Sequence, residues 1–253
     1  MEEQSEINHL INEMTPPPER IFVGDGDFKL TGDTFRNYFI ELGGLKPDST
    51  VLDVGCGIGR MAIPLTQYLS SKGEYWGFDV VKDGIDWCTE KITSRFPNFH
   101  FQLSDIHNQL YNPNGKYDAE TYKFPYPKDT FDFVFLTSVF THMLPKRLEN
   151  YLSEIVRVLK PDGNCFITYF LLNTESIDLI MQGASSQDFK YLVDECLSVD
   201  KIRPEIAIAY PEDIIKRFYK QYGLEILVPI QYGNWCGREK FLSYQDIIIG
   251  TYR

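Results

Sequence analysis

The sequence has few cysteines, and they are scattered. Among 253 residues there are five, no two of them form a CxxC pair, and none lies in a cluster with histidine. A structural zinc site needs such a cluster, and a disulfide-rich secreted scaffold needs regularly spaced, paired cysteines. We therefore predict reduced, mostly buried thiols in a cytoplasmic protein.

Long apolar runs and basic stretches are also lacking. No run approaches the ~20 apolar residues that cross a bilayer, and the acidic N-terminal stretch lacks the apolar core of a signal peptide. The 36 acidic residues outnumber the 25 lysines and arginines, giving a formal net charge of −11. Because such a surface repels phosphate backbones, we expect neither a nucleic-acid nor a membrane partner.

What the sequence does contain is the pattern of an α/β protein. Hydrophobic residues make up 43% of the chain, as in ordinary globular proteins. From residue 50 onward, short apolar runs alternate with helical patterns, which predicts right-handed crossovers and a parallel sheet. The last two runs have no helical pattern between them and should be antiparallel neighbours. The predicted strands are 50–54, 74–80, 99–103, 131–136, 165–172, 225–230 and 244–251.

The helices are predicted from apolar spacing and from capping residues. Asp33 should cap a helix that ends near Leu42, after a loop over residues 23–34. Asp83 should cap the helix that follows the second strand. Further helices are predicted at 5–14, 58–71, 146–160 and 211–222, whereas the segment 173–210 fits neither helix nor strand clearly.

A glycine-rich turn follows the first predicted strand. Gly55, Gly57 and Gly59 have GxGxG spacing at the point where a strand turns into a helix. Missing Cβ atoms let the main chain approach a ligand closely. Tight turns also need glycine for structural reasons alone. The motif therefore indicates a ligand site only if other residues near the same sheet edge point to one.

Three acidic residues are predicted at the same sheet edge as the glycine turn. Asp53, Asp79 and Asp105 fall at the ends of three successive strands, on the edge where open α/β sheets bind ligands. An acid after the second strand can accept both hydroxyls of a ribose, and one after the third can accept an adenine amino group. Each aspartate could instead be a helix cap or a turn former. Acids facing a nucleoside favour a ligand without phosphate.

With these motifs the sequence resembles the class I S-adenosylmethionine-dependent methyltransferases over residues 45–172. The resemblance implies a Rossmann-like α/β fold, with a seven-stranded, mostly parallel, doubly wound sheet of order 3-2-1-4-5-7-6 and a C-terminal antiparallel hairpin. The matching pieces are Val51–Arg60, Gly77–Val80, Ser104–Ile106, Phe124–Tyr126 before Phe131–Val134, and Arg157–Gly163.

The resemblance also implies a domain organisation. A single methyltransferase domain would span residues 1–253. Its parts would be an N-terminal helical cap at 1–44, a cofactor-binding core at 45–172, an insertion near the substrate at 173–210, and a final helix with the antiparallel pair at 211–253.

The resemblance assigns cofactor roles to particular residues. The main chain of the glycine turn would contact the methionine part of S-adenosylmethionine, whose product is S-adenosylhomocysteine. Acids would hold the ammonium group, the ribose and the adenine edge. No acidic cluster follows the fourth strand, so no metal is predicted. The implied cofactor-binding residues are Asp53, Gly55, Cys56, Gly57, Gly59, Asp79, Val80, Asp105, Ile106 and Thr137.

Three further residues are candidates for substrate chemistry. His142 lies just past the fourth strand and would be a base for a hydroxyl nucleophile, or else it shapes the pocket. Trp235 and Arg238 lie in a glycine-containing loop before the last strand. They would stack on substrate and meet an anion, or else form a packed tryptophan and a surface ion pair.

These observations predict methyl transfer to a small molecule, with O-methylation of a sugar or natural-product hydroxyl. The fourth strand ends without the Asn/Asp-Pro-Pro-Tyr/Phe signature of enzymes that methylate amino groups. Two alternatives stay open: a nicotinamide-dependent Rossmann oxidoreductase and a non-catalytic protein that binds S-adenosylmethionine. No pattern in the sequence indicates an oligomeric state.

Overall fold

The computed structural model describes residues 2–24 and 26–253. The chain divides into two compact units, Met1–Asp105 and Ile106–Arg253. Within the described residues, no helix has the length and hydropathy of a membrane span.

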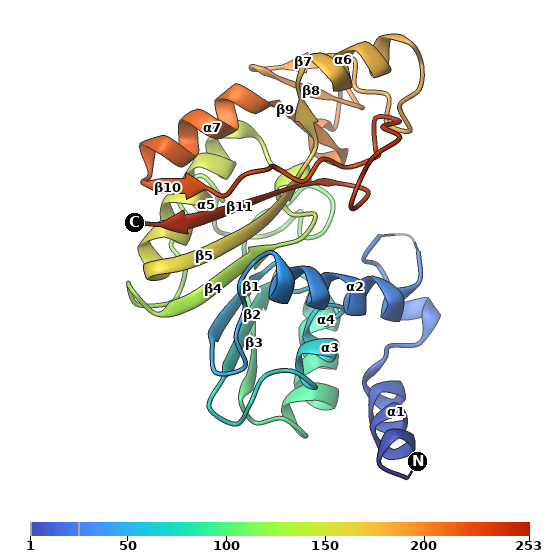
Figure 1. Ribbon diagram of the computed structural model, residues 1–253, viewed down its shortest axis with the longest axis vertical. Helices are drawn as coiled ribbons and strands as arrows, with labels where there is room; N and C mark the ends of the chain where they lie inside the picture. The colour runs from blue at the N-terminus through green and yellow to red at the C-terminus, as the bar shows by residue number, and fades with distance from the viewer. Residues whose placement is uncertain (1, 25) are drawn as a thin grey trace. The chain divides into compact units, whose positions relative to one another are not determined.

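The first unit contains three parallel strands and the helices before and between them (Figure 1). In the strand register, Asp53 pairs with Gly77, and Gly77 pairs with Phe101. All three predicted strands of this unit are present, the first and third with the predicted bounds. Its elements are β1 (Thr50–Val54), β2 (Glu74–Asp79), β3 (Phe99–Leu103), α1 (Glu2–Met14), α2 (Phe28–Glu41), α3 (Ala62–Leu65) and α4 (Lys82–Cys88).

The N-terminal end of α2 differs from the prediction. The helix begins at Phe28, and its cap is Asp27, whose Oδ1 accepts a hydrogen bond from the Leu30 N–H at 2.8 Å. The predicted cap, Asp33, lies inside the helix. Gly32, which suggested a loop, is buried where a Cβ would lie 2.5 Å from the Arg60 carbonyl oxygen. Glycine is tolerated here because it lets α2 approach the neighbouring main chain closely.

Two other helix predictions in this unit are corrected. Asp83 lies in the first turn of α4, and the cap position is Val81, which has no side-chain cap bond. The helix predicted over 58–71 is reduced to α3, because the Thr66 N–H is shared between the carbonyls of Ala62 and Ile63. The segment therefore tightens into turns instead of continuing as a helix.

The second unit contains the remaining strands of the main sheet. β4 (Phe131–Leu136) and β5 (Leu159–Tyr169) are parallel, and β11 (Asp246–Tyr252) is antiparallel both to β5 and to β10 (Leu224–Ile226). The seven-stranded sheet has the order β10-β11-β5-β4-β1-β2-β3. This confirms the predicted order and the antiparallel last pair. The helices α5 (Pro145–Val158) and α7 (Glu212–Gln221) belong to the same unit.

The segment that the sequence left unassigned forms a small layer of its own. It contains α6 (Thr174–Met181) and most of a four-stranded sheet of order β6-β9-β8-β7. A buried cluster that includes Phe170, Phe189 and Trp235 packs in this region. The strands are β6 (Leu171–Leu172), β7 (Tyr191–Val193), β8 (Cys196–Ser198) and β9 (Ile208–Pro211).

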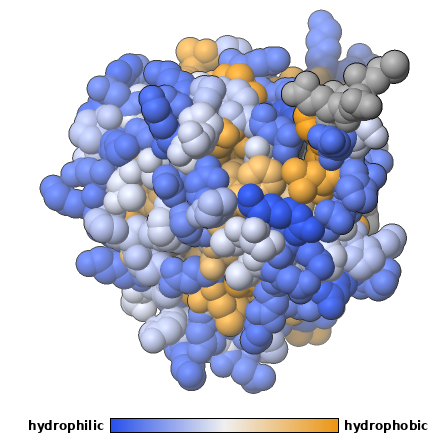
Figure 2. Space-filling view, turned by 90° about the horizontal axis from the view of Figure 1, so that it is seen from below, coloured by the Kyte–Doolittle hydropathy of each residue, from blue (hydrophilic) through white to orange (hydrophobic). Residues whose placement is uncertain are grey.

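One face of the molecule is seen in Figure 2. Hydrophilic side chains cover much of this face, and hydrophobic residues show between them. Exposed apolar residues of this kind are normal on a protein surface.

Candidate functional site

The turn after β1 has glycine, and so main chain without a side chain, at three positions. Gly55, Gly57 and Gly59 all have positive φ angles, of 83°, 56° and 86°. The N–H groups of Gly55 and Cys56 both donate to the carbonyl of Phe78, at 2.9 and 3.1 Å, which fixes the turn to β2. The turn is therefore held rigidly; Gly55 is partly exposed, whereas Gly57 and Gly59 are buried.

The segment before α2 lies against this turn. A Cβ on Gly57 would lie 2.6 Å from Cγ1 of Val23, and a Cβ on Gly84 would lie 3.1 Å from Cζ of Phe22. The guanidinium of Arg60 donates to the Val23 carbonyl at 2.5 Å, across 37 residues of sequence. Sequence analysis missed these contacts because no local pattern marks a pairing over that separation.

Asp79 ends β2 and binds the glycine turn directly. Its Oδ2 accepts from the Gly57 N–H and its Oδ1 from the Val81 N–H, both at 2.8 Å. Burial raises the pKa of Asp79, and these main-chain hydrogen bonds oppose that rise. The aspartate is thus a turn former, as the alternative interpretation held. Each oxygen keeps a second lone pair for a ligand.

Asp53 is a buried carboxyl that is only half satisfied. The Tyr75 hydroxyl donates to its Oδ2 at 2.5 Å. Its buried Oδ1 has no hydrogen-bond partner in the described part of the chain. Burial is the main reason that the pKa of Asp53 rises to about 8. Because an unsatisfied buried polar atom costs free energy, this oxygen indicates a ligand or an ordered water.

Tyr75 is a site residue that the sequence analysis did not name. It lies on β2 two residues before Gly77, the register partner of Asp53. Side chains two apart on a strand share a face, so Tyr75 could have been found from the predicted register. Its ring stacks on Phe99 at 5.0 Å between centroids, which holds the hydroxyl in place.

The other predicted cofactor residues lie near the ends of their strands. Val80 directly follows β2 and Asp105 follows β3 by two residues, and both are partly exposed. Ile106 is buried and makes an isolated bridge to Tyr117. Cys56 is buried, and burial raises the pKa of its thiol well above its usual range, so the thiol stays neutral.

The end of β4 has an unusual main-chain conformation. Thr137 directly follows the strand, and Ser138 has a φ of +63° although it is not glycine. The Ser138 N–H donates to the Thr168 hydroxyl at 2.7 Å, and Gln245 donates to the Ser138 hydroxyl at 2.9 Å. Strained backbone of this kind is concentrated at functional sites.

His142 ends the helical turn Phe140–His142 that follows. Its Nδ1 lies 3.1 Å from the carbonyl oxygen of Glu205, and the edge of its ring faces Tyr111 at 6.4 Å between centroids. A carbonyl only accepts, so Nδ1 must donate, which leaves Nε2 as the basic nitrogen of the neutral ring. Burial lowers the pKa of His142, so the ring is neutral at pH 7.

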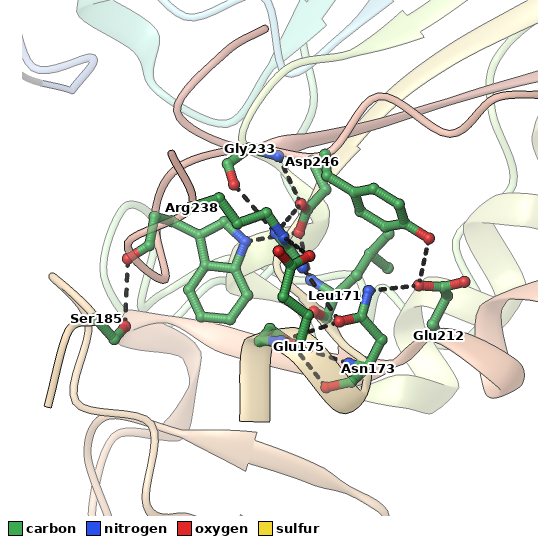
Figure 3. A network of polar contacts seen from close by, with 11 residues as sticks. Leu171, Asn173, Glu175, Ser185, Glu212, Gly233, Arg238 and Asp246 are labelled. Carbon is green, nitrogen blue, oxygen red and sulfur yellow. Dashed lines mark hydrogen bonds and ion pairs between the residues drawn. The ribbon is translucent and has the colours of Figure 1, made fainter. Parts of the chain in front are cut away.

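Arg238 and Asp246 lie in a polar network of the second unit (Figure 3), and Trp235 belongs to it through its bond to Asp246. Trp235 is fully buried, and its Nε1 donates to Asp246 Oδ2 at 2.7 Å. Arg238 pairs with Asp246 Oδ1 at 3.0 Å, and its guanidinium lies 4.8 Å from the centre of the Tyr232 ring. The structure therefore has the packed tryptophan and ion pair of the alternative interpretation, except that the ion pair is buried.

Asp246 is the centre of that network. Its carboxylate also accepts from the N–H groups of Leu171 and Gly233, both at 2.7 Å. Arg238 in turn donates to Glu175 and to Asn173, whose side chain caps α6. These bonds join β11, the 233–238 loop and the start of α6. Their geometry is that of a structural support, with both charged groups already paired.

No group of three or more histidine, cysteine, aspartate or glutamate side chains is placed to hold a metal ion among the described residues. The prediction that the protein needs no metal stays a prediction.

A glycine turn after the first strand, acids after the next strands and an antiparallel last pair define the methyltransferase class of α/β proteins. Comparisons with known proteins agree. The family described as "Methyltransferase domain" matches residues 45–223, well over half of the chain. The chain belongs to this family, and the resemblance to class I S-adenosylmethionine-dependent methyltransferases is confirmed.

Curated relatives share only part of their length with the chain. A ubiquinone/menaquinone biosynthesis C-methyltransferase of Wigglesworthia glossinidia brevipalpis is 26% identical over 54% of this chain and 48% of its own length. Phosphoethanolamine N-methyltransferase 3 of Arabidopsis thaliana is 27% identical over 59% of this chain and 26% of its own. The chain thus spans about half or less of these two relatives.

A solved structure supports the fold. Magnesium protoporphyrin IX methyltransferase from Synechocystis, with bound S-adenosylhomocysteine, superposes with a TM-score of 0.56 at 15% identity. The superposition covers 99% of this chain and 95% of that one.

Proposed function

We propose that this chain transfers the methyl group of S-adenosylmethionine to a hydroxyl oxygen of a small molecule, such as a sugar or another natural product. The observation that carries the proposal is the half-satisfied carboxyl of Asp53 beside the glycine turn. A cofactor with an ammonium group would supply the hydrogen-bond donor that this buried oxygen lacks, and its charge would add to that of Arg60.

The residues of the first unit fit that cofactor. Bound S-adenosylmethionine supplies an electrophilic methyl group on a sulfonium centre. The bare main chain of Gly55–Gly59 would lie against its amino-acid part, with Asp53 near the ammonium. Asp79 would accept from the ribose hydroxyls with its remaining lone pairs. Val80 and Asp105 would lie beside the adenine, whereas the roles predicted for Ile106 and Thr137, which belong to the second unit, stay predictions.

The N-terminal residues fit a covering role. Residues 1–44 would form the cap, because Val23 already packs on Gly57 and is held there by Arg60. A segment over the glycine turn would exclude water from the methionine part of a bound ligand.

His142 would be the base. A hydroxyl nucleophile must lose a proton as the bond from its oxygen to the methyl carbon forms, and Nε2 of a neutral imidazole can take it. Lowering of its pKa by burial keeps the ring in that neutral form at pH 7. The remainder of the rate enhancement would come from alignment of nucleophile and methyl group.

The choice of oxygen as the acceptor atom rests on the residues that follow β4. The printed names of relatives include a C-methyltransferase and an N-methyltransferase, and these names describe those proteins alone. We favour oxygen because His142 follows β4, where the sequence has Thr137-Ser138-Val139 instead of the amino-methylation signature. Trp235 and Arg238 have no part in this proposal, since the structure pairs both within the protein.

The test is a search for product. Purified protein is incubated with S-adenosylmethionine carrying a deuterated methyl group and with a cytoplasmic metabolite pool, and products are detected by mass. We expect a labelled product that is heavier by one deuterated methyl group, and we expect NMR of the purified product to place that group on a hydroxyl oxygen. Wild-type protein that binds S-adenosylhomocysteine but labels nothing in the pool would favour the non-catalytic alternative. Label on nitrogen or carbon would overturn the choice of oxygen.

A further inference from the structure

An ion pair with little exposure lies beside the helical turn that carries His142. Arg147, in the first half of α5, donates from Nη1 to Glu205 Oε1 at 2.5 Å. The two side chains are only 14% and 7% exposed. Two charges held in such surroundings interact far more strongly than a pair on the surface. The pair therefore ties α5 firmly to the short turn Pro204–Ile206.

The same Glu205 contacts His142 through its main chain. Its carbonyl oxygen is the acceptor 3.1 Å from Nδ1 of the imidazole. The side chain of Glu205 is thus fixed by Arg147 while its carbonyl fixes the imidazole. Movement of the Pro204–Ile206 turn would break the hydrogen bond that sets the tautomer of His142.

Further contacts hold this turn and its ring. The main chain of Ile206, like that of Glu205, is a hydrogen-bond partner of the imidazole. Tyr210, on β9, donates from its hydroxyl to the main-chain carbonyls of Phe140 and Met143, on either side of His142. The ring of Tyr111 meets the imidazole in a T-shaped contact. Charged groups close to this region include Glu205, Arg147 and Asp118, whose Oδ1 lies 3.7 Å from Arg147 Nε.

We propose that Arg147 and Glu205 are positioning residues for the methyl-transfer base. Their ion pair holds the Glu205 carbonyl against Nδ1 of His142, and Nε2 is thereby kept as the free, basic nitrogen. This inference rests on the proposed function for its meaning in catalysis. Its structural content stands independently: the tautomer of His142, and the dependence of that tautomer on the neighbouring Arg147–Glu205 ion pair.

The direct test is nitrogen NMR on the full-length chain labelled with ¹⁵N-histidine. The chain has four histidines, and the signal lost in His142→Gln assigns the ring. At a pH where the ring is neutral, we expect the tautomer protonated at Nδ1 to predominate. In Arg147→Gln and Glu205→Gln we expect that preference to fall by about tenfold, the scale of one net hydrogen bond. Arg147→Lys keeps the charge and should retain most of the preference.

A matched control lies on the same helix. Arg157 pairs with Glu154 at 2.5 Å, with side chains 25% and 11% exposed. Arg157→Gln should lower thermal stability by a similar amount and leave the His142 tautomer unchanged. A wild-type ring protonated at Nε2, or an unchanged tautomer in folded Glu205→Gln and Arg147→Gln, would overturn the inference.

Kinetics separate this inference from the proposed function once an acceptor is known. Arg147→Gln should lower kcat about tenfold or more, because small displacements of a base are costly. It should leave KM for S-adenosylmethionine unchanged. If His142→Gln keeps full turnover, the assignment of the base fails while the tautomer result remains. If the tautomer depends on Arg147 but kcat does not, the positioning role in catalysis is excluded.

Discussion

Asp53 combines burial, a strong hydrogen bond from Tyr75 and one oxygen without a partner. Burial raises the pKa of this carboxyl to about 8, so without a ligand it is mostly protonated at pH 7. A bound ammonium favours the carboxylate, lowers the pKa and releases a proton. The affinity for an ammonium-bearing ligand should therefore increase as the pH rises toward 8.

This linkage is measurable with S-adenosylhomocysteine. Between pH 6 and 7 we expect the affinity of the wild type to rise by up to about tenfold, as followed by titration calorimetry. Asp53→Asn cannot titrate, so its affinity should be weaker and nearly independent of pH over the same interval. Equal pH dependence in both proteins would remove Asp53 from the ammonium site.

The burial of His142 predicts a second effect of pH, this time on turnover. It arises from a lowered pKa, whereas the pKa of Asp53 is raised. Burial lowers its pKa below the usual ~6.5. Since the base must be neutral, turnover should be lost only as the pH falls below that value. The acid limb of kcat should thus lie below pH ~6.5, and His142→Gln should lower kcat by about 10²–10⁴. A loss under tenfold would make His142 a pocket-shaping residue.

Single residues differed in how well the sequence revealed them. Asp53 and Asp79 could be placed because they follow apolar runs that end at one sheet edge. The sequence could not show that Asp79 accepts a hydrogen bond from the Gly57 N–H, or that Trp235 and Arg238 both donate to Asp246. These hydrogen bonds join residues 22 positions apart for Asp79 and Gly57, and 11 and 8 apart for Asp246 with Trp235 and Arg238, and no local pattern encodes them.

The glycine turn can be tested against a glycine of the same conformation elsewhere. Gly59 has a φ of +86°, and a Cβ there would lie 2.9 Å from both Cys88 Sγ and Ile92 Cδ1. Gly183 has a φ of +75° with nothing within 4 Å. Backbone strain alone costs about 1–2 kcal/mol, and crowding adds about 1–3. Gly59→Ala should lower the free energy of unfolding, measured with denaturant, by about 2–5 kcal/mol, and Gly183→Ala should lower it by about 1–2 kcal/mol.

Of these two substitutions, only Gly59→Ala should also weaken the binding of S-adenosylhomocysteine. If both substitutions lowered the free energy of unfolding equally, packing of the glycine turn against α4 and against the residues that follow α4 would contribute nothing to stability.

The buried network around Asp246 supports the loop between β10 and β11. Arg238→Met leaves a buried carboxylate without its cation, which costs about 3–5 kcal/mol. We expect the Tm to fall by about 10 °C while the affinity for S-adenosylhomocysteine is retained in the folded protein. Combining it with Asp246→Asn should cost less than the sum of the two single losses. An unchanged Tm with lost turnover would instead favour a role of Arg238 toward substrate.

Strands were easier to predict than helices. β1, β3 and β4 are continuous apolar or alternating runs, and their bounds match the prediction. β1 and β4 are largely buried, which explains their apolar sequences, whereas β3 is exposed at Gln102 and Leu103. The start of α2 was missed because Gly32 and the Gly/Asp-rich residues before it favour a loop locally, and tertiary packing against Arg60 overrides that preference.

The arrangement of the main sheet followed from the order of elements along the chain. Parallel crossovers are right-handed, and a pair without a helix between its strands is antiparallel, so few topologies remained. The layer of α6 and β7–β9 could not be predicted in this way, since its strands of three or four residues are too short to show a clear hydrophobic periodicity. The family of the chain could thus be predicted, whereas the part of the molecule that differs most from a simple α/β core could not.

The central claim is that the glycine turn and its acids hold an S-adenosyl ligand. Its most direct test is thermal unfolding with S-adenosylhomocysteine or NAD at a hundred times the dissociation constant measured for S-adenosylhomocysteine. Binding at that level stabilises by about 2.7 kcal/mol, so S-adenosylhomocysteine should raise the Tm by about 5–10 °C, and NAD should leave it unchanged. A rise with NAD and none with S-adenosylhomocysteine would contradict the account.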